Sequence, residues 1–248
     1  MIKIYVINLI TQKDRRNRIL SEAKKLELVL NIENAVIGSE INSSFLNKFQ
    51  LESKIKIGRQ LSPGEIGCYL SHINCLKKFL NTQDEYAIIL EDDVKIDSKL
   101  ADFIKSIKHS MSWPLFDVLL LGYRNGYGSF WGGSIWYSNK LIRFVDCGYG
   151  AHAYLITRQG AEKILKYNIE PIWPYDYVTG GRADSRIRVY GLKEKIIELD
   201  AENSSNSSLE SERNKLGASS ANLDTKSFNL FKLAKRFIKG LKPIKAYK

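Results

Sequence analysis

Three consecutive carboxylates, Glu91, Asp92 and Asp93, directly follow the apolar run 86–90. Such a run is typical of a buried strand, so the acids should emerge at the carboxyl end of a sheet, where open α/β sheets bind ligands. Neighbouring carboxylates repel one another, and a bound cation offsets that repulsion. If the strand geometry persists, Glu91 and Asp93 lie on one side and could bind a hard divalent ion with its diphosphate. A solvated acidic turn is the alternative.

A histidine lies on the helix that the sequence marks most clearly. Ser62 can cap this helix, Pro63 suits its first position and Glu65 completes a capping box, so we predict a helix from there to about residue 80. Helical periodicity places His72 on a buried face, beside the polar side that contains Ser71. His72 is therefore either a core residue with satisfied hydrogen bonds or part of a site.

Cys68, His72 and Cys75 follow one another at i, i+4 and i+7 along this helix. This spacing could present zinc ligands, but the sequence offers no convincing fourth ligand, and structural zinc is bound by four. We therefore expect thiols packed in the core. With Cys147 the chain has three cysteines, an odd number that gives no disulfide framework and suits a reducing compartment.

The elements that position these residues alternate between strand and helix. Strand, helix and strand open the chain, an order typical of a nucleotide-binding α/β sheet, and the pattern continues to about residue 199. We predict a mostly parallel, Rossmann-like sheet flanked by helices. The expected strands are 3–9, 33–37 (ending at Gly38), 86–90, 116–122, 152–157 and 195–199, with helices at 14–30, 62–80 and 158–166.

The net charge of +11 is concentrated at the end of the chain. Residues 226–248 contain eight Lys or Arg and no acid, whereas the first 225 residues hold 30 basic and 27 acidic side chains. The body therefore lacks the basic surface of a nucleic-acid binder, and we expect no nucleic-acid partner. No apolar run approaches the ~18–20 residues of a membrane span, and the short apolar N-terminus is expected to be a strand, not a signal peptide.

Three regions follow from composition. Residues 1–202 are expected to form one α/β domain, and 203–225 a Ser/Asn-rich linker. Residues 226–248 combine an apolar helical stripe with lysines, which predicts a basic amphipathic helix on an anionic membrane surface. A disordered basic tail or a helix that docks on a partner protein are the alternatives.

Five segments in order resemble glycosyltransferase family 25, which includes lipopolysaccharide and lipooligosaccharide β-1,4-galactosyltransferases and the collagen galactosyltransferases. The resemblance covers about residues 1–200 and leaves the tail outside. The segments are YVINL followed by DRR (5–16), LSPGEIGCYLSH (61–72), IILEDDV (88–94), GAHAYLITRQGAEKIL (150–165) and PYDYV (174–178).

The resemblance implies a GT-A-like fold, a UDP-sugar donor, a divalent metal (usually Mn²⁺) and inversion at the anomeric carbon. Glu91-Asp92-Asp93 matches the family's D-x-D-like motif, with Glu in the first position, so Asp93 and Glu91 are the expected metal ligands. Asp176 matches the Pro-x-Asp acid and is expected to be a further ligand or the catalytic base. Asp184 and Asp146 are less favoured bases.

The remaining candidates concern the donor. Arg15 and Arg16 open the first helix and suit a phosphate or uracil site, unless they form a solvated helix end. His152 begins a strand after a glycine and could face the diphosphate or acceptor, although a core role is equally compatible with its position. With His72, Asp93 and Asp176 as the catalytic set, the donor-binding set is Asn8, Arg15, Arg16, Gly38, Ser71, Glu91, Asp92 and His152.

The sequence thus predicts an inverting transferase that moves a hexose, galactose from UDP-galactose above all, to a lipooligosaccharide or lipopolysaccharide acceptor. It would work in the cytoplasm, peripherally on the inner face of the bacterial inner membrane. Use of UDP-glucose or a UDP-N-acetylhexosamine on the same scaffold is one alternative. A catalytically silent glycan- or nucleotide-binding module at the membrane is another.

Overall fold

A computed structural model of the chain describes residues 2–108, 116–124, 129–130, 135–136, 139–144, 147–184 and 186–200. The expected linker (203–225) and basic tail (226–248) lie outside the described residues. Among the helices within those ranges, none is both long and apolar enough to cross a bilayer.

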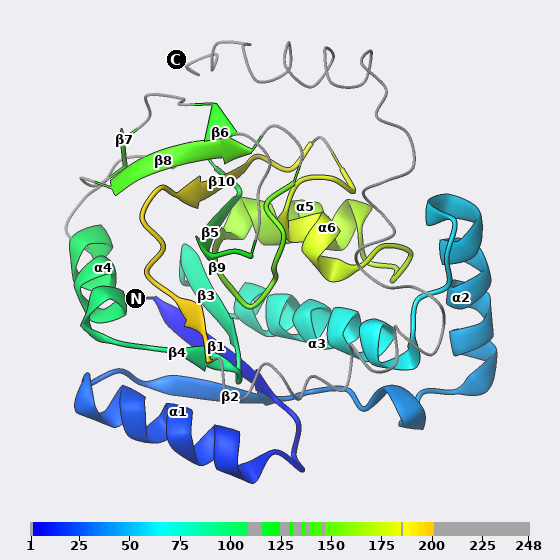
Figure 1. Cartoon of the computed structure of the whole chain (residues 1–248), viewed down its shortest axis with the longest axis horizontal. Helices are drawn as coiled ribbons and strands as arrows, with labels where there is room; N and C mark the ends of the chain where they lie inside the picture. The colour runs from blue at the N-terminus through cyan, green and yellow to red at the C-terminus, as the bar shows by residue number, and fades with distance from the viewer. Residues whose placement is uncertain are drawn as a thin grey trace.

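The described elements alternate between strands and helices for most of the chain (Figure 1). The strands are β1 (Lys3–Asn8), β2 (Leu30–Asn34), β3 (Tyr86–Glu91), β4 (Val94–Lys95), β5 (Val118–Gly122), β6 (Ser129–Phe130), β7 (Ile135–Trp136), β8 (Asn139–Phe144), β9 (Ala153–Thr157), β10 (Val189–Leu192) and β11 (Glu198–Leu199). The helices are α1 (Lys13–Lys25), the 3-10 turn η1 (Gly38–Glu40), α2 (Ser43–Ile57), α3 (Pro63–Leu80), α4 (Ser98–Lys108), α5 (Arg158–Tyr167) and α6 (Tyr175–Thr179).

The main sheet has the strand order β2-β1-β3-β9-β5-β10-β8-β6, with β7 paired to β8. β1 runs parallel to β2 and β3, and β10 runs parallel to β5. β9, however, is antiparallel to both its neighbours, β3 and β5. The expected α/β sheet flanked by helices is confirmed, with parallel and antiparallel pairs combined. The direction of β9 brings its first residue to the edge where β3 and β5 end.

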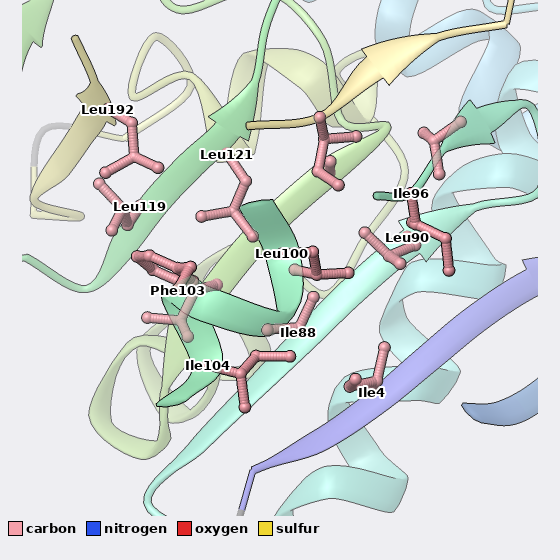
Figure 2. Close-up of a cluster of buried hydrophobic side chains, with 14 of the residues drawn as sticks. Ile4, Ile88, Leu90, Ile96, Leu100, Phe103, Ile104, Leu119, Leu121 and Leu192 are labelled. Atoms are coloured by element: carbon pink, nitrogen blue, oxygen red, sulfur yellow. The ribbon is translucent and has the colours of Figure 1, made fainter. Parts of the chain in front are cut away.

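The two faces of the sheet carry separate cores, because side chains alternate along each strand. Ile88 and Leu90 of β3 face α1 and α4, in the cluster that Figure 2 shows with Leu100 and Phe103 of α4. Ile89 faces the opposite side, where α3, α5 and α6 pack. α3 therefore lies against the sheet on the face toward which alternate residues of β3 point.

The helix α3 begins as the sequence predicts. The Ser62 hydroxyl accepts from the backbone N–H of Glu65, and the Glu65 carboxylate accepts from the N–H of Ser62. The start of this helix packs closely on η1, because a Cβ on Gly38 would lie 2.3 Å from the backbone of Pro63. A Cβ on Gly67 would lie 2.5 Å from the Val36 carbonyl oxygen. Only glycine permits this backbone contact.

Several expected boundaries were wrong. The strand expected at 33–37 ends at Asn34, and the helix expected to reach residue 30 ends at Lys25. The strand expected at 195–199 is reduced to β11, which pairs with β4 outside the main sheet. β10, α2 and α4 were not predicted. The pairing partners of β10 are distant in sequence, whereas α2 packs on the nearby Leu61 and Ile66 but has no clear apolar stripe.

Loss of the cap should weaken this framework. Replacing Ser62 by Ala removes the acceptor for the Glu65 N–H and should lower the free energy of unfolding by about 1–2 kcal/mol, since capping side chains contribute on this scale. Urea unfolding followed by circular dichroism measures the change. Ser44→Ala on the exposed first turn of α2 is the control. Equal stability of the Ser62 variant and the wild type would show that the cap contributes nothing.

Candidate active site

A cavity of about 450 Å³ opens at the carboxyl end of β1 and β3. Its wall combines the β2–η1 connection, the start of α3, the acids after β3, residues 150–152 before β9 and the start of α6. Segments from both halves of the chain therefore border one space. The expected site residues in this lining are Arg15, Gly38, Ser71, His72, Glu91, Asp92, Asp93, His152 and Asp176.

Glu91 points toward α3, as the alternation along β3 requires. Its Oε1 lies 3.4 Å from His72 Nε2, and His72 Nδ1 lies 3.1 Å from the Tyr154 hydroxyl. That hydroxyl lies 3.2 Å from the hydroxyl of Tyr175, whose ring stacks on His72 at 4.2 Å. His72 is fully buried, so its ring is fixed by contacts on both edges and one face. Burial raises the pKa of Glu91, but the His72 hydrogen bond and the electrostatic effects of His72, His152 and Arg124 together lower it overall.

Asp92 points the other way, toward β1 and α1. Its Oδ2 accepts a 2.7 Å hydrogen bond from Asn8 Nδ2, and its Oδ1 lies 3.3 Å from Arg15 Nη1. Arg18 of α1 also donates to the Asp92 carbonyl oxygen at 2.7 Å. Burial raises the pKa of Asp92, while Asn8 and Arg15 partly offset the rise. Strand geometry therefore does not continue past Glu91, and the three acids diverge.

Asp93 lies in the turn after β3. Its carbonyl oxygen accepts a 2.7 Å hydrogen bond from the N–H of Asp200, the residue after β11, and this bond fixes the backbone of the turn. Among the described residues, no hydrogen-bond partner reaches the buried Oδ1 of Asp93. Burial, followed by the charges of Glu91 and Asp92, raises the pKa of Asp93 to about 7. A buried carboxylate oxygen without a donor, beside two other acids, fits a hard divalent cation.

His152 reaches the site because β9 is antiparallel. It immediately precedes β9, and its carbonyl oxygen accepts from the Glu91 N–H at 2.9 Å. Its ring packs against Gly122 and Gly150, where an added Cβ would lie 2.7 and 2.8 Å from ring atoms. Gly150 also has a φ of +118°, which favours glycine. Burial lowers the pKa of His152 to about 4, so the ring is neutral at pH 7.

The acids considered as catalytic bases differ in whether they line the cavity. Asp176, in the first turn of α6, lines the cavity. Asp184 is absent from the lining and is paired with Arg186 through two hydrogen bonds of 2.9 and 3.0 Å from Nε. Asp146 lies outside the described residues. Of the two acids that the structure describes, Asp176 lines the cavity and Asp184 does not.

The other residues expected to bind the nucleotide-sugar donor differ in whether they border the cavity. Arg15 borders it, whereas Arg16 and Asn8 are not among the described lining residues. Asn8 instead holds Asp92. Ser71 accepts from the Val36 N–H at 2.8 Å and donates to the Gly67 carbonyl at 2.7 Å, so its hydroxyl fixes the β2–η1 connection.

Two arginines of this site were not predicted from the sequence. Arg124, which follows β5, lines the cavity, and its charge lowers the pKa of both Glu91 and Asp93. Arg18 binds the carbonyl oxygens of Asp92 and Val94, which sets the turn that presents the acids. Arg18 lies one helical turn from Arg15, and that spacing was a usable signal. Nothing local marks Arg124, because the end of β5 meets the acids only through β9.

The first 127 residues match the family model described as glycosyltransferase family 25 (LPS biosynthesis protein). The chain is 28% identical to procollagen galactosyltransferase 2 of Homo sapiens over 173 residues, which are 67% of this chain and 28% of that protein. It is 30% identical over 172 residues to a Bos taurus protein described as probable inactive glycosyltransferase 25 family member 3, covering 66% of this chain and 28% of that one. The chain thus spans less than a third of these relatives.

Among solved structures, the chain aligns with a glycosyltransferase involved in the glycosylation of the major capsid of PBCV-1. The alignment covers 87% of this chain and 98% of that one, at 11% identity and a TM-score of 0.43.

The raised pKa of Asp93 gives a pH-dependent stability. Between the ordinary value of 3.8 and about 7, the folded protein keeps a proton that the unfolded chain has released, so the free energy of unfolding falls as pH rises through this window. The Asp93→Asn side chain does not titrate, so this variant should not lose stability in that window. The free energy of unfolding of the variant minus that of wild type should therefore be larger at pH 8 than at pH 4, by at least about 1.4 kcal/mol. Urea unfolding with chelator present tests this. Asp102→Asn, at an exposed position on α4, is the control; parallel profiles of the Asp93 variant and wild type would contradict the prediction.

Proposed function

The chain belongs to glycosyltransferase family 25, and on that premise we propose that it is an inverting, metal-assisted hexosyltransferase. The observation that carries the proposal is the convergence of Glu91, Asp93 and Asp176 on one cavity. Cleavage of a nucleotide sugar requires charge neutralisation at the departing diphosphate and a base for the acceptor hydroxyl. The acids after β3 and the acid of α6, which are far apart in the sequence, suit these two requirements.

Asp93 and Glu91 are the residues proposed to hold a divalent cation, because the Asp93 carboxylate has a buried oxygen to which none of the described residues donates a hydrogen bond. Such a cation, when bound, neutralises negative charge on the donor diphosphate. Arg124 and Arg15 border the same cavity and would add positive charge beside the phosphates. Mn²⁺ is the proposed ion, by analogy with the family.

Asp176 is the proposed base. It would take the proton of the acceptor hydroxyl as that oxygen forms a bond to the anomeric carbon on the face opposite the leaving group. The bond between the anomeric carbon and the phosphate oxygen breaks, and UDP departs with the electron pair. The sugar is transferred with inversion, and the proton ends on the Asp176 carboxylate. His152, held neutral by burial, borders this space as a polar group without charge.

Galactose is the proposed sugar, because the relatives include procollagen galactosyltransferases. A bacterial lipopolysaccharide or lipooligosaccharide acceptor is proposed from the description of the family model. The same scaffold would also accommodate UDP-glucose or a UDP-N-acetylhexosamine. The similarity to a protein described as probable inactive keeps a silent binding module as the competing function, although the retained acids favour catalysis.

The purified protein, incubated with a panel of UDP-sugars in Mn²⁺ or chelator, should release UDP from one donor only when metal is present. Asp93→Ala should lower the metal affinity by more than about 100-fold, since even indirect support of a metal ligand contributes 10–100-fold. Asp102→Ala, at an exposed position on α4, is the matched control. Absence of UDP release from every donor, with glycolipid extract added, would favour the silent module.

Asp176→Asn keeps the size of the side chain but cannot accept the proton. Transfer should fall by about 10²–10⁴-fold, the usual contribution of a general base, with little change in donor affinity. Steady-state transfer and donor binding by calorimetry separate the two effects. Asp184→Asn, at the acid paired with Arg186, should leave the rate near that of wild type. If the Asp176 variant transfers at the wild-type rate, another group is the base.

We also propose that residues 226–248 bind an anionic membrane from the cytoplasmic side, which would bring the cavity to a glycolipid acceptor. Each lysine near such a surface contributes about 1 kcal/mol, and this segment holds eight Lys or Arg. Deleting it should move the protein from the membrane pellet to the supernatant without loss of donor hydrolysis. Sedimentation with anionic vesicles measures this, and continued sedimentation of the truncated protein would rule out the anchor.

A further inference from the structure

A second group of potential metal ligands lies in the wall of the cavity, beside the acids assigned to the donor. Sγ of Cys68, a ring nitrogen of His72 and a carboxylate oxygen of Glu91 all lie within 4.8 Å of one another. Cys68 and His72 are one turn apart on α3, and Glu91 faces them from β3. We propose that these three side chains bind a thiophilic divalent cation such as Zn²⁺, at a site that overlaps the donor-metal site because Glu91 belongs to both.

The ligand chemistry separates the two sites. Thiolate and imidazole favour Zn²⁺, whereas carboxylate oxygens favour Mg²⁺ or Mn²⁺. Zinc binds sulfur at about 2.3 Å and imidazole nitrogen at about 2.0–2.1 Å, which places tetrahedral ligand atoms about 3–4 Å apart. The upper limit of 4.8 Å on the separations of these atoms lies close to that range, and His72 Nε2 and Glu91 Oε1 are already 3.4 Å apart. On binding, the Cys68 thiol would release its proton to solvent, and one thiolate with one carboxylate would neutralise the ion.

The surroundings of His72 support this site independently of the three ligands. When a metal occupies Nε2, the proton of the imidazole is on Nδ1 and needs an acceptor, which in most protein sites orients the ring. The Tyr154 hydroxyl lies 3.1 Å from Nδ1 and is itself 3.2 Å from the Tyr175 hydroxyl. Tyr154 is fully buried and Tyr175 is 3% exposed, so this support is built into the core.

Cys75 takes no part in this site, although its spacing from Cys68 and His72 along the sequence had suggested a possible third zinc ligand. It is fully buried in the core between α3 and the sheet and is not among the described lining residues. Burial strongly raises the pKa of its thiol. Glu91 of β3 takes the place of a second cysteine. Three protein ligands leave a fourth position open toward the cavity, as in zinc sites that bind water or a ligand.

The two sites would compete because both use Glu91. Zinc held by Cys68 and His72 would withdraw the Glu91 carboxylate from the donor metal, so Zn²⁺ should inhibit the Mn²⁺-dependent reaction. This consequence rests on the proposed function, whereas binding of the thiophilic ion does not.

Co²⁺ reports directly on a thiolate ligand. Added to the metal-free full-length protein, one equivalent should produce a thiolate-to-cobalt charge-transfer band in the near ultraviolet, and Zn²⁺ should abolish it. Cys68→Ser, a nearly isosteric change at a partly exposed position, should remove the band. Cys75→Ala should keep it. Absence of the band in wild type, or its persistence in Cys68→Ser, would overturn the proposal.

Tyr154→Phe tests the support of the ring without removing a ligand. The band should remain at saturating Co²⁺, while the affinity falls by about 10–100-fold, as for other partners of metal-bound histidines. Unchanged affinity would exclude the Tyr154 hydroxyl as the acceptor for Nδ1–H.

UDP release gives the last readout. Wild-type activity with Mn²⁺ should fall on addition of Zn²⁺, and Cys68→Ser should resist Zn²⁺ inhibition. Equal inhibition of both proteins would contradict competition through Glu91. Absence of UDP release under every condition would count against the transferase function alone, since the cobalt spectrum decides the metal site without it.

Discussion

Three negative charges on consecutive residues repel one another by several kcal/mol when they are partly buried, and much of the structure around β3 serves to separate them. Glu91 turns to α3, where His72 meets it, and Asp92 turns to α1, where Asn8 and Arg15 hold it. Asp93 remains at the cavity. Arg18, by binding the backbone of this turn, sets the divergence. The position of α1 against the sheet is thereby tied to the direction of each acid.

The antiparallel course of β9 has an equally wide effect. A parallel strand at this place would have delivered Thr157 to the cavity and left His152 at the opposite edge. Instead, the chain enters β9 at the edge where β3 and β5 end, so Gly150 and His152 join the acids, and α6 follows with Asp176. The site therefore depends on both halves of the described chain, although the family model matches only residues 1–127.

Local signals carried most of what could be predicted. The capping box, the apolar run before Glu91 and the alternation from β9 to α5 each lie within a few residues, and they placed α3, β3 and α5 nearly correctly. The grouping of Arg15, Glu91, His152 and Asp176 also agrees with the family resemblance. The turn at Asp92, the contribution of Arg124 and the approach of Cys68 to Glu91 could not be predicted, because each depends on a contact between elements far apart in sequence.

The place of β9 between β3 and β5 also constrains how the protein is made. As the chain leaves the ribosome, β3 appears more than sixty residues before β9 is complete. Until then its Ile88, Ile89 and Leu90 have no strand on one side, and β5 lacks its neighbour as well. Unpaired apolar edges of this kind favour aggregation. Synthesis of the nascent chain therefore passes through an interval in which chaperone protection of β3 matters most, and that interval ends at Thr157.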